Sequence, residues 1–476
     1  MNNIVSADLA ALDTILDAIK QQGYDYLQQL DQRSTSTGER PEPVACLPAA
    51  GGGTLHALNQ FNDRFEKIIV ASSGPRFWGF VTGGSTPASI AGDWLTSIYD
   101  QNPQGEGGRA DVSALIEKET IELLLDLFRL PRHFLGGFVT GATMSNFTGL
   151  AVARQWIGKQ LDKDFAKQGV IPADIKIFTA TPHSSAVKSL SMLGIGSSNF
   201  SGIKTVAGNR ESLDIVDLEE KIQQLSGQPF ILISSAGTVN TVDFDDFEAI
   251  GKLKNRYRFW WHIDAAFGGF AACSPLYEHL LKGWENADSI AVDCHKWLNV
   301  PYENAFYLVR EEHQLLQLET FQNSNAPYLG DPLVDFNYLN FLPENSRRLK
   351  ALPVWFSLMA YGKNGYKDIV EQCIDMARLF GNFIEQEDRL ILLAPVRLNT
   401  VCFTLKDDAM QTQVDPFLAL INSTGKVYMT PAVYGGKKAI RAAFVNYRTT
   451  ANDIRIATET ITTCLQKIFE RTTVQL

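Results

Sequence analysis

Residues 260–270, WWHIDAAFGGF, and residues 289–302, SIAVDCHKWLNVPY, decide the fold that we predict for this chain. Each stretch opens with a run of mainly apolar residues and then meets charged side chains, Asp264 in the first and Lys296 in the second. Such runs are typical of buried strands in an open α/β sheet, where ligands bind at the carboxyl ends of the strands. Two neighbouring strands would therefore place Asp264 and Lys296 at the same edge of the sheet, facing one pocket.

Asp264 and Lys296 have a common chemical explanation. Pyridoxal phosphate needs a lysine amine for its Schiff base and a carboxylate that keeps its ring nitrogen protonated. The alternative is an ordinary aspartate at a strand end and a surface lysine. His295 and the apolar Trp297 on either side of Lys296 argue against a solvated turn. We therefore predict a pyridoxal phosphate site with Lys296 and Asp264 as its central residues.

The composition limits the classes of protein that this chain can belong to. Its 476 residues, 45% hydrophobic and 20% charged, suit a soluble globular enzyme of two or three structural units. The 43 basic and 53 acidic residues give a net charge of −10, which repels phosphate backbones and argues against nucleic acid as a partner. No run approaches the roughly 20 apolar residues of a membrane span. The start of the chain contains acids and no basic segment, so we expect no signal peptide.

The six cysteines and seven histidines are dispersed along the chain, without CxxC pairs. This distribution is typical of a reduced, cytoplasmic protein without a zinc site. We therefore predict a cytoplasmic location and no metal ligands.

The pattern along the chain predicts three parts. Residues 1–85 form an N-terminal helical and dimerisation segment, in which residues 4–30 have the spacing of one long amphipathic helix. This helix could pack on its own body or across a dimer. Strand–helix alternation within residues 86–350 predicts a large cofactor-binding domain with a mainly parallel sheet. Residues 351–476 form a smaller α+β domain.

The segments HIDAAFGGF and DCHKWLNVPY, in this order and spacing, resemble the group II pyridoxal-phosphate-dependent amino acid decarboxylases, which include the aromatic amino acid, glutamate and diaminobutyrate enzymes. The resemblance covers most of the chain. It implies the aspartate-aminotransferase-like α/β fold, called fold type I, in a homodimer with active sites at the subunit interface. It also implies decarboxylation of an L-amino acid to an amine and CO2 through a Schiff base on Lys296.

A turn of small residues, GATMSN at residues 141–146, lies between a short apolar run and a helix predicted to begin near Ser145. Helix N-termini bind phosphate through free N–H groups. The resemblance places Ala142 and Thr143 among the phosphate ligands, although Met144 replaces a family glutamate. Asp293 stands where the family often has asparagine. Because a carboxylate near a phosphate is unfavourable unless it points away, we expect only a backbone contact from Asp293.

Further residues are assigned to the cofactor by the same resemblance. His183 follows a predicted strand and matches the family histidine that stacks on the cofactor ring, where it is also a candidate proton carrier. Ser235 matches a hydroxyl near the ring, although a serine at a strand end is often only a cap. Ala266 would lie under the flat ring, and His295 joins Lys296 on the cofactor side.

On the substrate side, the glycine- and aromatic-rich segment 72–102 contains Phe80, a candidate substrate contact with core packing as the alternative. Arg441, in a predicted strand, resembles the arginine that pairs with a substrate carboxylate, with a structural ion pair as the alternative. Residues 314–338 lack clear periodicity and predict a lid loop. In it, Tyr328 resembles the family tyrosine that protonates the substrate carbon, and an exposed loop tyrosine is the alternative.

Two other functions stay open. An aminotransferase or an aldehyde-forming enzyme could use the same fold, and Tyr328 favours the decarboxylase because aldehyde-forming relatives commonly have phenylalanine there. A catalytically silent interaction protein is the third hypothesis. The joint presence of Lys296, Asp264, His183 and Tyr328 speaks against it. The identity of the amino acid substrate does not follow from the sequence.

Overall fold

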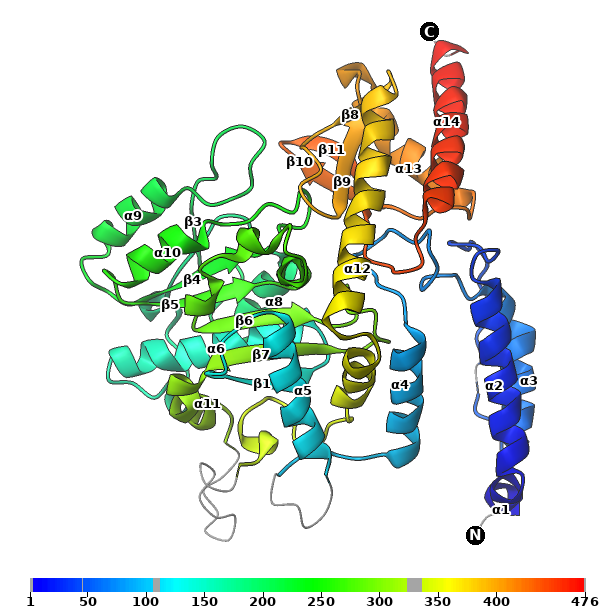
Figure 1. Cartoon of the computed structure of the whole chain (residues 1–476), viewed down its shortest axis with the longest axis horizontal. Helices are drawn as coiled ribbons and strands as arrows, with labels where there is room; N and C mark the ends of the chain where they lie inside the picture. The colour runs from blue at the N-terminus through cyan, green and yellow to red at the C-terminus, as the bar shows by residue number, and fades with distance from the viewer. Residues whose placement is uncertain (1–2, 45, 106–111, 323–335, 475–476) are drawn as a thin grey trace.

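The computed structural model describes residues 3–44, 46–105, 112–322 and 336–474. Figure 1 shows three regions: a large sheet with helices on both of its faces, a smaller sheet with long helices beside it, and a separate group of N-terminal helices. The division of the chain at residues 85 and 350 stays a prediction.

The large sheet has seven strands, and its order explains why the cofactor residues meet. Neighbouring strands are parallel except β7, which is antiparallel to both of its neighbours, so the prediction of a mainly parallel sheet is confirmed. In spatial order the strands are β1 (Phe134–Val139), β7 (Ala305–Arg310), β6 (Ser289–Asp293), β5 (Phe259–Asp264), β4 (Phe230–Ser235), β2 (Lys176–Thr179) and β3 (Ser201–Gly202).

Strands β5 and β6 are direct neighbours, with Asp264 opposite Ala291. Both strands are buried along their whole length, as expected for parallel strands that are covered on two faces. Asp264 is the last residue of β5, and Lys296 follows β6 by three residues. The two residues therefore lie at the same edge of the sheet, as the sequence predicts.

Helix α6 (Ala142–Gln160) packs against β5, β6 and β7, and most of its residues are buried. It begins three residues before the predicted start at Ser145, because Gly141 in extended conformation already serves as its N-cap. The other helices of this domain are α4 (Pro87–Tyr99), α5 (Ser113–Leu127), α7 (Phe165–Gln168), α8 (Ser184–Met192), α9 (Ile215–Gln224), α10 (Phe247–Lys254) and α11 (Gln314–Phe321). Helix α11 is a correction, since we predicted that the loop begins at residue 314.

The smaller sheet is antiparallel, in the order β10 (Thr430–Tyr434), β11 (Lys437–Ala443), β9 (Thr400–Leu405) and β8 (Leu390–Leu392). Helices α12 (Ala351–Gln386), α13 (Val414–Ser423) and α14 (Ala451–Val474) complete this unit. Helix α12 is interrupted at Gly362, whose φ of 57° suits glycine. Because β11 is an inner strand, Arg441 is anchored by neighbours on both sides, Thr430 and Cys402.

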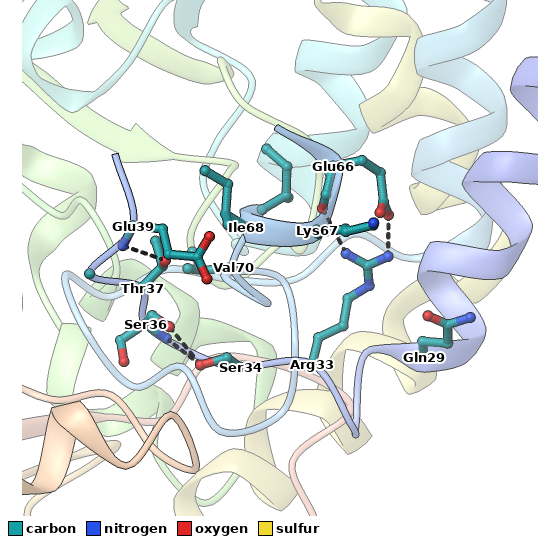
Figure 2. Close-up of a pocket in the computed structure, with 12 residues that line it drawn as sticks. Gln29, Arg33, Ser34, Ser36, Thr37, Glu39, Glu66, Lys67, Ile68 and Val70 are labelled. Carbon is teal, nitrogen blue, oxygen red and sulfur yellow. Dashed lines mark hydrogen bonds and ion pairs between the residues drawn. The ribbon is translucent and has the colours of Figure 1, made fainter. Parts of the chain in front are cut away.

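The N-terminal segment forms two helices instead of the single predicted one, α1 (Asn3–Ala10) and α2 (Leu12–Gln29), with a break at Ala11. Helix α3 (Thr54–Arg64) lies beside α2, and Gln22 and Asn62 join them by hydrogen bonds of 2.8 and 3.0 Å. In Figure 2, Arg33 pairs with Glu66 across a surface hollow of about 600 Å³. This ion pair ties the end of α2 to the segment after α3.

The described helices, which lie within residues 3–44, 46–105, 112–322 and 336–474, include none that is long and apolar enough to cross a membrane.

Candidate active site

A cavity of about 340 Å³ at the carboxyl edge of the large sheet collects side chains from the large sheet and from strand β11 of the smaller sheet. The strand ends of β4 and β5, the turn after β6, the start of α8, the segment before α4 and strand β11 all contribute to its lining. Of the residues predicted from the sequence, it is lined by Phe80, His183, Ser235, Asp264, Ala266, Lys296 and Arg441.

Lys296 reaches the cavity from the turn that follows β6. Its side chain is largely buried, and Nζ lies 3.1 Å from Oδ2 of Asp293 and 5.6 Å from the ring centre of Phe267. The segment before α4 passes close to this turn, since a Cβ on Gly83 would lie 1.9 Å from the carbonyl oxygen of Lys296. Only glycine permits this approach, which holds the lysine backbone in place.

Asp264 is buried, and both of its oxygens accept hydrogen bonds. Oδ2 accepts from Nδ2 of Asn146 at 3.0 Å, and Oδ1 accepts from the backbone N–H of Ala266 at 3.2 Å. These two donors fix the direction of the carboxylate. The carboxylate is therefore suited to hold a protonated ring nitrogen in the cavity.

His183 is the N-cap of α8, and its Nδ1 accepts the backbone N–H of Ser185 at 3.2 Å. The Ser185 hydroxyl lies 2.7 Å from the same nitrogen. Burial lowers the pKa of His183, against the opposite effect of the Asp264 charge. The imidazole is therefore neutral near pH 7, with its proton on Nε2.

Asp293 does not point away from the phosphate turn, which differs from our expectation. Its Oδ1 accepts the backbone N–H of Ala142 at 2.9 Å, at the N-terminus of α6. Nε2 of His295 lies 3.3 Å from the same oxygen, and burial lowers the pKa of His295. The cavity lining does not include Ala142, Thr143 or His295. Through its contacts, Asp293 connects Ala142 and His295 to Lys296.

Arg441 extends from β11 into the cavity, and the described residues close to its guanidinium do little to neutralise its positive charge. Its Nη1 donates to the carbonyl oxygen of Val239 at 3.2 Å, and its Nε has no hydrogen-bond partner among the described residues. Burial lowers the pKa of Arg441. In the part of the chain that the structure describes, no carboxylate lies within ion-pair distance of this guanidinium, so the alternative of a structural ion pair finds no support there.

Phe80 lines the cavity with 61% of its surface exposed and a φ of 56°. Its aromatic neighbours Phe77 and Trp78 are buried instead, and Trp78 packs against Phe380 and Phe444 in the core. Core packing therefore accounts for these two residues, and Phe80 alone of the three faces the cavity.

Tyr328 lies outside the described residues. The sequence interpretation missed Asn146 and His262, which are fully buried and hydrogen-bonded beneath Asp264. A signal for His262 was available, because residues two apart in a strand point to the same face, so that His262 accompanies Asp264.

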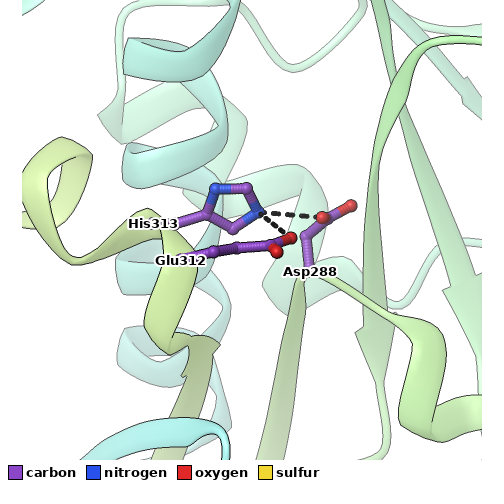
Figure 3. A group of neighbouring side chains, drawn as sticks. All are labelled: Asp288, Glu312 and His313. Carbon is purple, nitrogen blue, oxygen red and sulfur yellow. Dashed lines mark hydrogen bonds and ion pairs between the residues drawn. The ribbon is translucent and has the colours of Figure 1, made fainter.

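A cluster of Asp288, Glu312 and His313 has side chains that commonly bind metals, and it lies at the opposite end of β6 (Figure 3). The oxygens of Asp288 already have protein partners. Oδ1 lies 2.9 Å from Nε2 of His313, and Oδ2 accepts the N–H of Trp261 at 2.7 Å and pairs with Lys254. We interpret this cluster as an internal network that fixes the amino edge of the sheet.

The donor set fits pyridoxal phosphate. The cavity offers an amine, a doubly hydrogen-bonded carboxylate, and an imidazole together with the small residue Ala266, which leaves room for a flat ring. The N-terminus of α6, next to Asp293, supplies the kind of N–H donors that bind phosphate. The carboxylate of Asp293 is the one departure from this fit. A lysine and a carboxylate placed in this way on this sheet define a pyridoxal-phosphate enzyme of fold type I.

The comparison with known proteins identifies the family. Residues 54–406 match the pyridoxal-dependent decarboxylase conserved domain. An aromatic-L-amino-acid decarboxylase from Catharanthus roseus is 25% identical over 401 residues, 80% of this chain and 78% of the relative. A phenylacetaldehyde synthase from a Rosa hybrid cultivar is also 25% identical, over 93% of this chain and 92% of the relative.

Among solved structures, Oryza sativa TDC with PLP and tryptamine superimposes with a TM-score of 0.88 at 21% identity, over 96% of this chain and 98% of that chain. Mouse CSAD superimposes with a TM-score of 0.85 at 21% identity, over 96% of this chain and 99% of that chain. The chain belongs to the pyridoxal-dependent decarboxylase family, and pyridoxal phosphate is its cofactor.

Proposed function

We propose that this enzyme converts an L-amino acid into the corresponding amine and CO2. The observation that carries the proposal is the convergence of Lys296, Asp264 and His183 on one cavity with Arg441, which forms no ion pair with any described residue. Pyridoxal phosphate, when bound in this cavity, would supply an acceptor for the electron pair that is released when the bond from Cα of the substrate to its carboxylate breaks.

The residues of the chain have separate tasks in this proposal. Asp264 would hold the protonated ring nitrogen, and His183 and Ala266 would contact the ring. Ser235, which lines the same cavity, would contact the ring hydroxyl. Ala142, Thr143 and His295 hold the phosphate end, where the N-terminus of α6 contributes a positive dipole.

Arg441 binds a carboxylate of the substrate, and Phe80 contacts the substrate at the mouth of the cavity. After CO2 leaves, Cα gains one proton, so that the amine carries a hydrogen where the substrate carried the carboxylate. The donor is Tyr328 or the Nε2–H of His183. Lys296 would hold the cofactor through its amine between turnovers.

Amine formation is favoured over aldehyde formation by the tyrosine at position 328, because a hydroxyl there can protonate Cα. The relatives include both decarboxylases and an aldehyde synthase, so product identification is the decisive experiment. Purified enzyme is incubated with the twenty amino acids, diaminobutyrate, ornithine and dihydroxyphenylalanine, and products are identified by mass spectrometry. We expect one amine lighter by CO2, and no product from Lys296→Ala.

An aldehyde from the native enzyme would overturn the proposal of amine formation. Tyr328→Phe supplies an internal comparison, because it removes one hydroxyl and keeps the ring. We expect this variant to lose amine formation and to gain aldehyde. If Tyr328→Phe forms amine at the native rate, the proton comes from another group, and His183→Gln should then abolish amine formation.

We also propose that two copies of the chain form a homodimer through the N-terminal helices. Helix α2 buries only Ile15, while Leu12, Leu16 and Ile19 are 48%, 49% and 40% exposed. A row of exposed apolar residues on one helix marks a binding face. Leu12→Asp/Leu16→Asp should reduce the mass measured by light scattering to that of a monomer, and Gln28→Asp on the same helix should not.

A cytoplasmic location is part of the proposal and is supported by the cysteines. All six are free thiols, and five of them are buried. Free thiols suit a reducing compartment.

A further inference from the structure

A line of buried polar side chains runs beneath the cavity and ends at Asp264. Nε1 of Trp260 donates to Oγ of Ser289 at 2.9 Å, and that hydroxyl lies 2.8 Å from Nδ1 of His262. Nε2 of His262 lies 2.8 Å from Oδ1 of Asn146, whose Nδ2 donates to Oδ2 of Asp264 at 3.0 Å. The first four of these residues have no exposed surface.

The two ends of the line favour one direction for these hydrogen bonds, because the carboxylate oxygen of Asp264 accepts from Asn146 and the indole N–H of Trp260 donates to Ser289. An indole N–H can only donate, so Ser289 accepts from Trp260 and its own proton is free for Nδ1 of His262. The imidazole then carries its proton on Nε2, which donates to the oxygen of Asn146. The amide of Asn146 must therefore present its nitrogen to Asp264, and every bond in the line points toward that carboxylate.

The amide of Asn146 also controls the histidine of the cavity. Its Nδ2 lies 3.2 Å from Oγ of Ser185, and this hydroxyl lies 2.7 Å from Nδ1 of His183. Ser185 accepts from the amide and donates to the imidazole, which keeps the proton of His183 on Nε2. One amide thus orients the carboxylate and the imidazole that flank the cofactor ring.

The surroundings of His262 keep this line dry and closely packed. Helix α6 touches the imidazole through Gly149, because a Cβ at that position would lie 2.9 Å from Nδ1 of His262. Burial lowers the pKa of His262 to about 4, so the ring stays neutral at pH 7 and can accept at Nδ1 while it donates at Nε2. A chain of aligned hydrogen bonds in such a medium strengthens its terminal bond.

We propose that Asn146, His262 and Ser289 are positioning residues, whose one-directional hydrogen bonds fix the ionised carboxylate of Asp264 at the cofactor ring nitrogen and fix the proton of His183. If any of these residues reversed the direction of its hydrogen bonds, the amide oxygen of Asn146 would turn toward Asp264. Two hydrogen-bond acceptors would then face each other. The inference rests on the cofactor and not on whether an amine or an aldehyde is formed.

The test uses Ser289→Ala, Asn146→Leu and His262→Phe. Ser234→Ala is a matched control, because Oγ of Ser234 accepts the indole N–H of Trp261 at 2.8 Å on the neighbouring strand and is equally buried. In each protein we would measure the dissociation constant of pyridoxal phosphate and the nitrogen chemical shift of ¹⁵N-labelled cofactor, which reports protonation of the ring nitrogen. Thermal unfolding of the cofactor-free proteins serves as the measure of stability.

We expect Asn146→Leu to weaken cofactor binding by about tenfold or more, as for the loss of a hydrogen bond to a charged group. Ser289→Ala should weaken cofactor binding in the same direction, because the proton on His262 is no longer directed toward Asn146. The labelled nitrogen should shift toward its unprotonated value in both variants, and Ser234→Ala should change stability alone. The inference fails if the three variants keep the native nitrogen shift. It also fails if Ser234→Ala changes the shift as much as Ser289→Ala. Should His262→Phe not fold, the two other variants decide.

Discussion

Nζ of Lys296 lies 3.1 Å from Oδ2 of Asp293, while the other oxygen of this carboxylate accepts the N–H of Ala142 at 2.9 Å. One buried acid thus contacts both the lysine proposed to bind the cofactor and the helix terminus proposed for its phosphate. A carboxylate and a phosphate repel each other when they share a donor.

We predict that Asp293→Asn binds pyridoxal phosphate more tightly, by about tenfold, because the substitution removes a negative charge and keeps an oxygen that accepts from Ala142. Titration of the cofactor-free protein measures the dissociation constant, with inorganic phosphate as a second ligand. Asp264→Asn is the comparison, since it should weaken cofactor binding and leave phosphate binding unchanged. Weaker binding of both ligands by Asp293→Asn would contradict this account.

Arg441 should show opposite effects on stability and activity. Its guanidinium is buried with an unpartnered Nε, so Arg441→Met removes a charge that costs free energy in the unliganded protein. We expect the melting temperature to stay the same or to rise, and kcat/KM to fall by about a hundredfold or more, because the substrate carboxylate loses its partner.

Arg441→Lys is the control, because it keeps the charge without the planar pair of donors, and it should be intermediate in kcat/KM. A fall in melting temperature for Arg441→Met, with kcat/KM unchanged, would assign the arginine to structure instead.

Arg347 forms a buried ion pair with Glu117, with Nη1–Oε1 and Nη2–Oε2 distances of 2.8 and 3.1 Å. The backbone N–H of Phe138 also donates to Oε1 of Glu117. Arg347→Met leaves a buried carboxylate without its cation and should destabilise the fold by roughly 3–5 kcal/mol. Adding Glu117→Gln should recover part of this loss, because the amide is neutral and keeps an acceptor for Phe138.

Urea unfolding of the two single variants and the double variant measures this coupling. Strictly additive effects would show that the pair does not act as a unit.

His262 should make the stability of the fold depend on pH. Burial lowers its pKa from 6.5 to about 4, so the unfolded chain binds a proton in this range that the folded chain does not. Stability is therefore full above pH 6.5 and is lost as the pH falls toward 4, by roughly 3 kcal/mol.

The check compares urea unfolding of the cofactor-free native protein and His262→Phe at pH 7 and pH 4.5, at one protein concentration. We expect a smaller loss in the variant. The effect of Asp245 on the pH dependence of stability has the opposite sign, because burial raises its pKa to about 7. Asp245 is present in both proteins, so its contribution cancels when their losses of stability are compared. Equal losses in both proteins would show that His262 is not the source.

The sequence by itself was sufficient to predict the mainly parallel sheet and the position of Asp264 and Lys296 at one edge of it. Buried apolar runs that end in Asp264 and Lys296 specify neighbouring strands, because ligands bind where parallel strands end. These signals are local, since each depends on a few consecutive residues. His183, Ser235 and Ala266 were assigned by the resemblance to the decarboxylase family, and the structure places all three in the lining of the same cavity.

Tertiary structure decided what the sequence could not. Asn146 lies 118 residues from Asp264 and 116 residues from His262 in the chain, and Glu117 lies 230 residues from Arg347. The direction of Asp293 toward Ala142, across 151 residues, was likewise not evident from either motif. A hydrogen bond depends on distances of about 3 Å and on the direction of each donor. The packing of α6 against β5 and β6 creates these contacts, and no pattern within one segment specifies them.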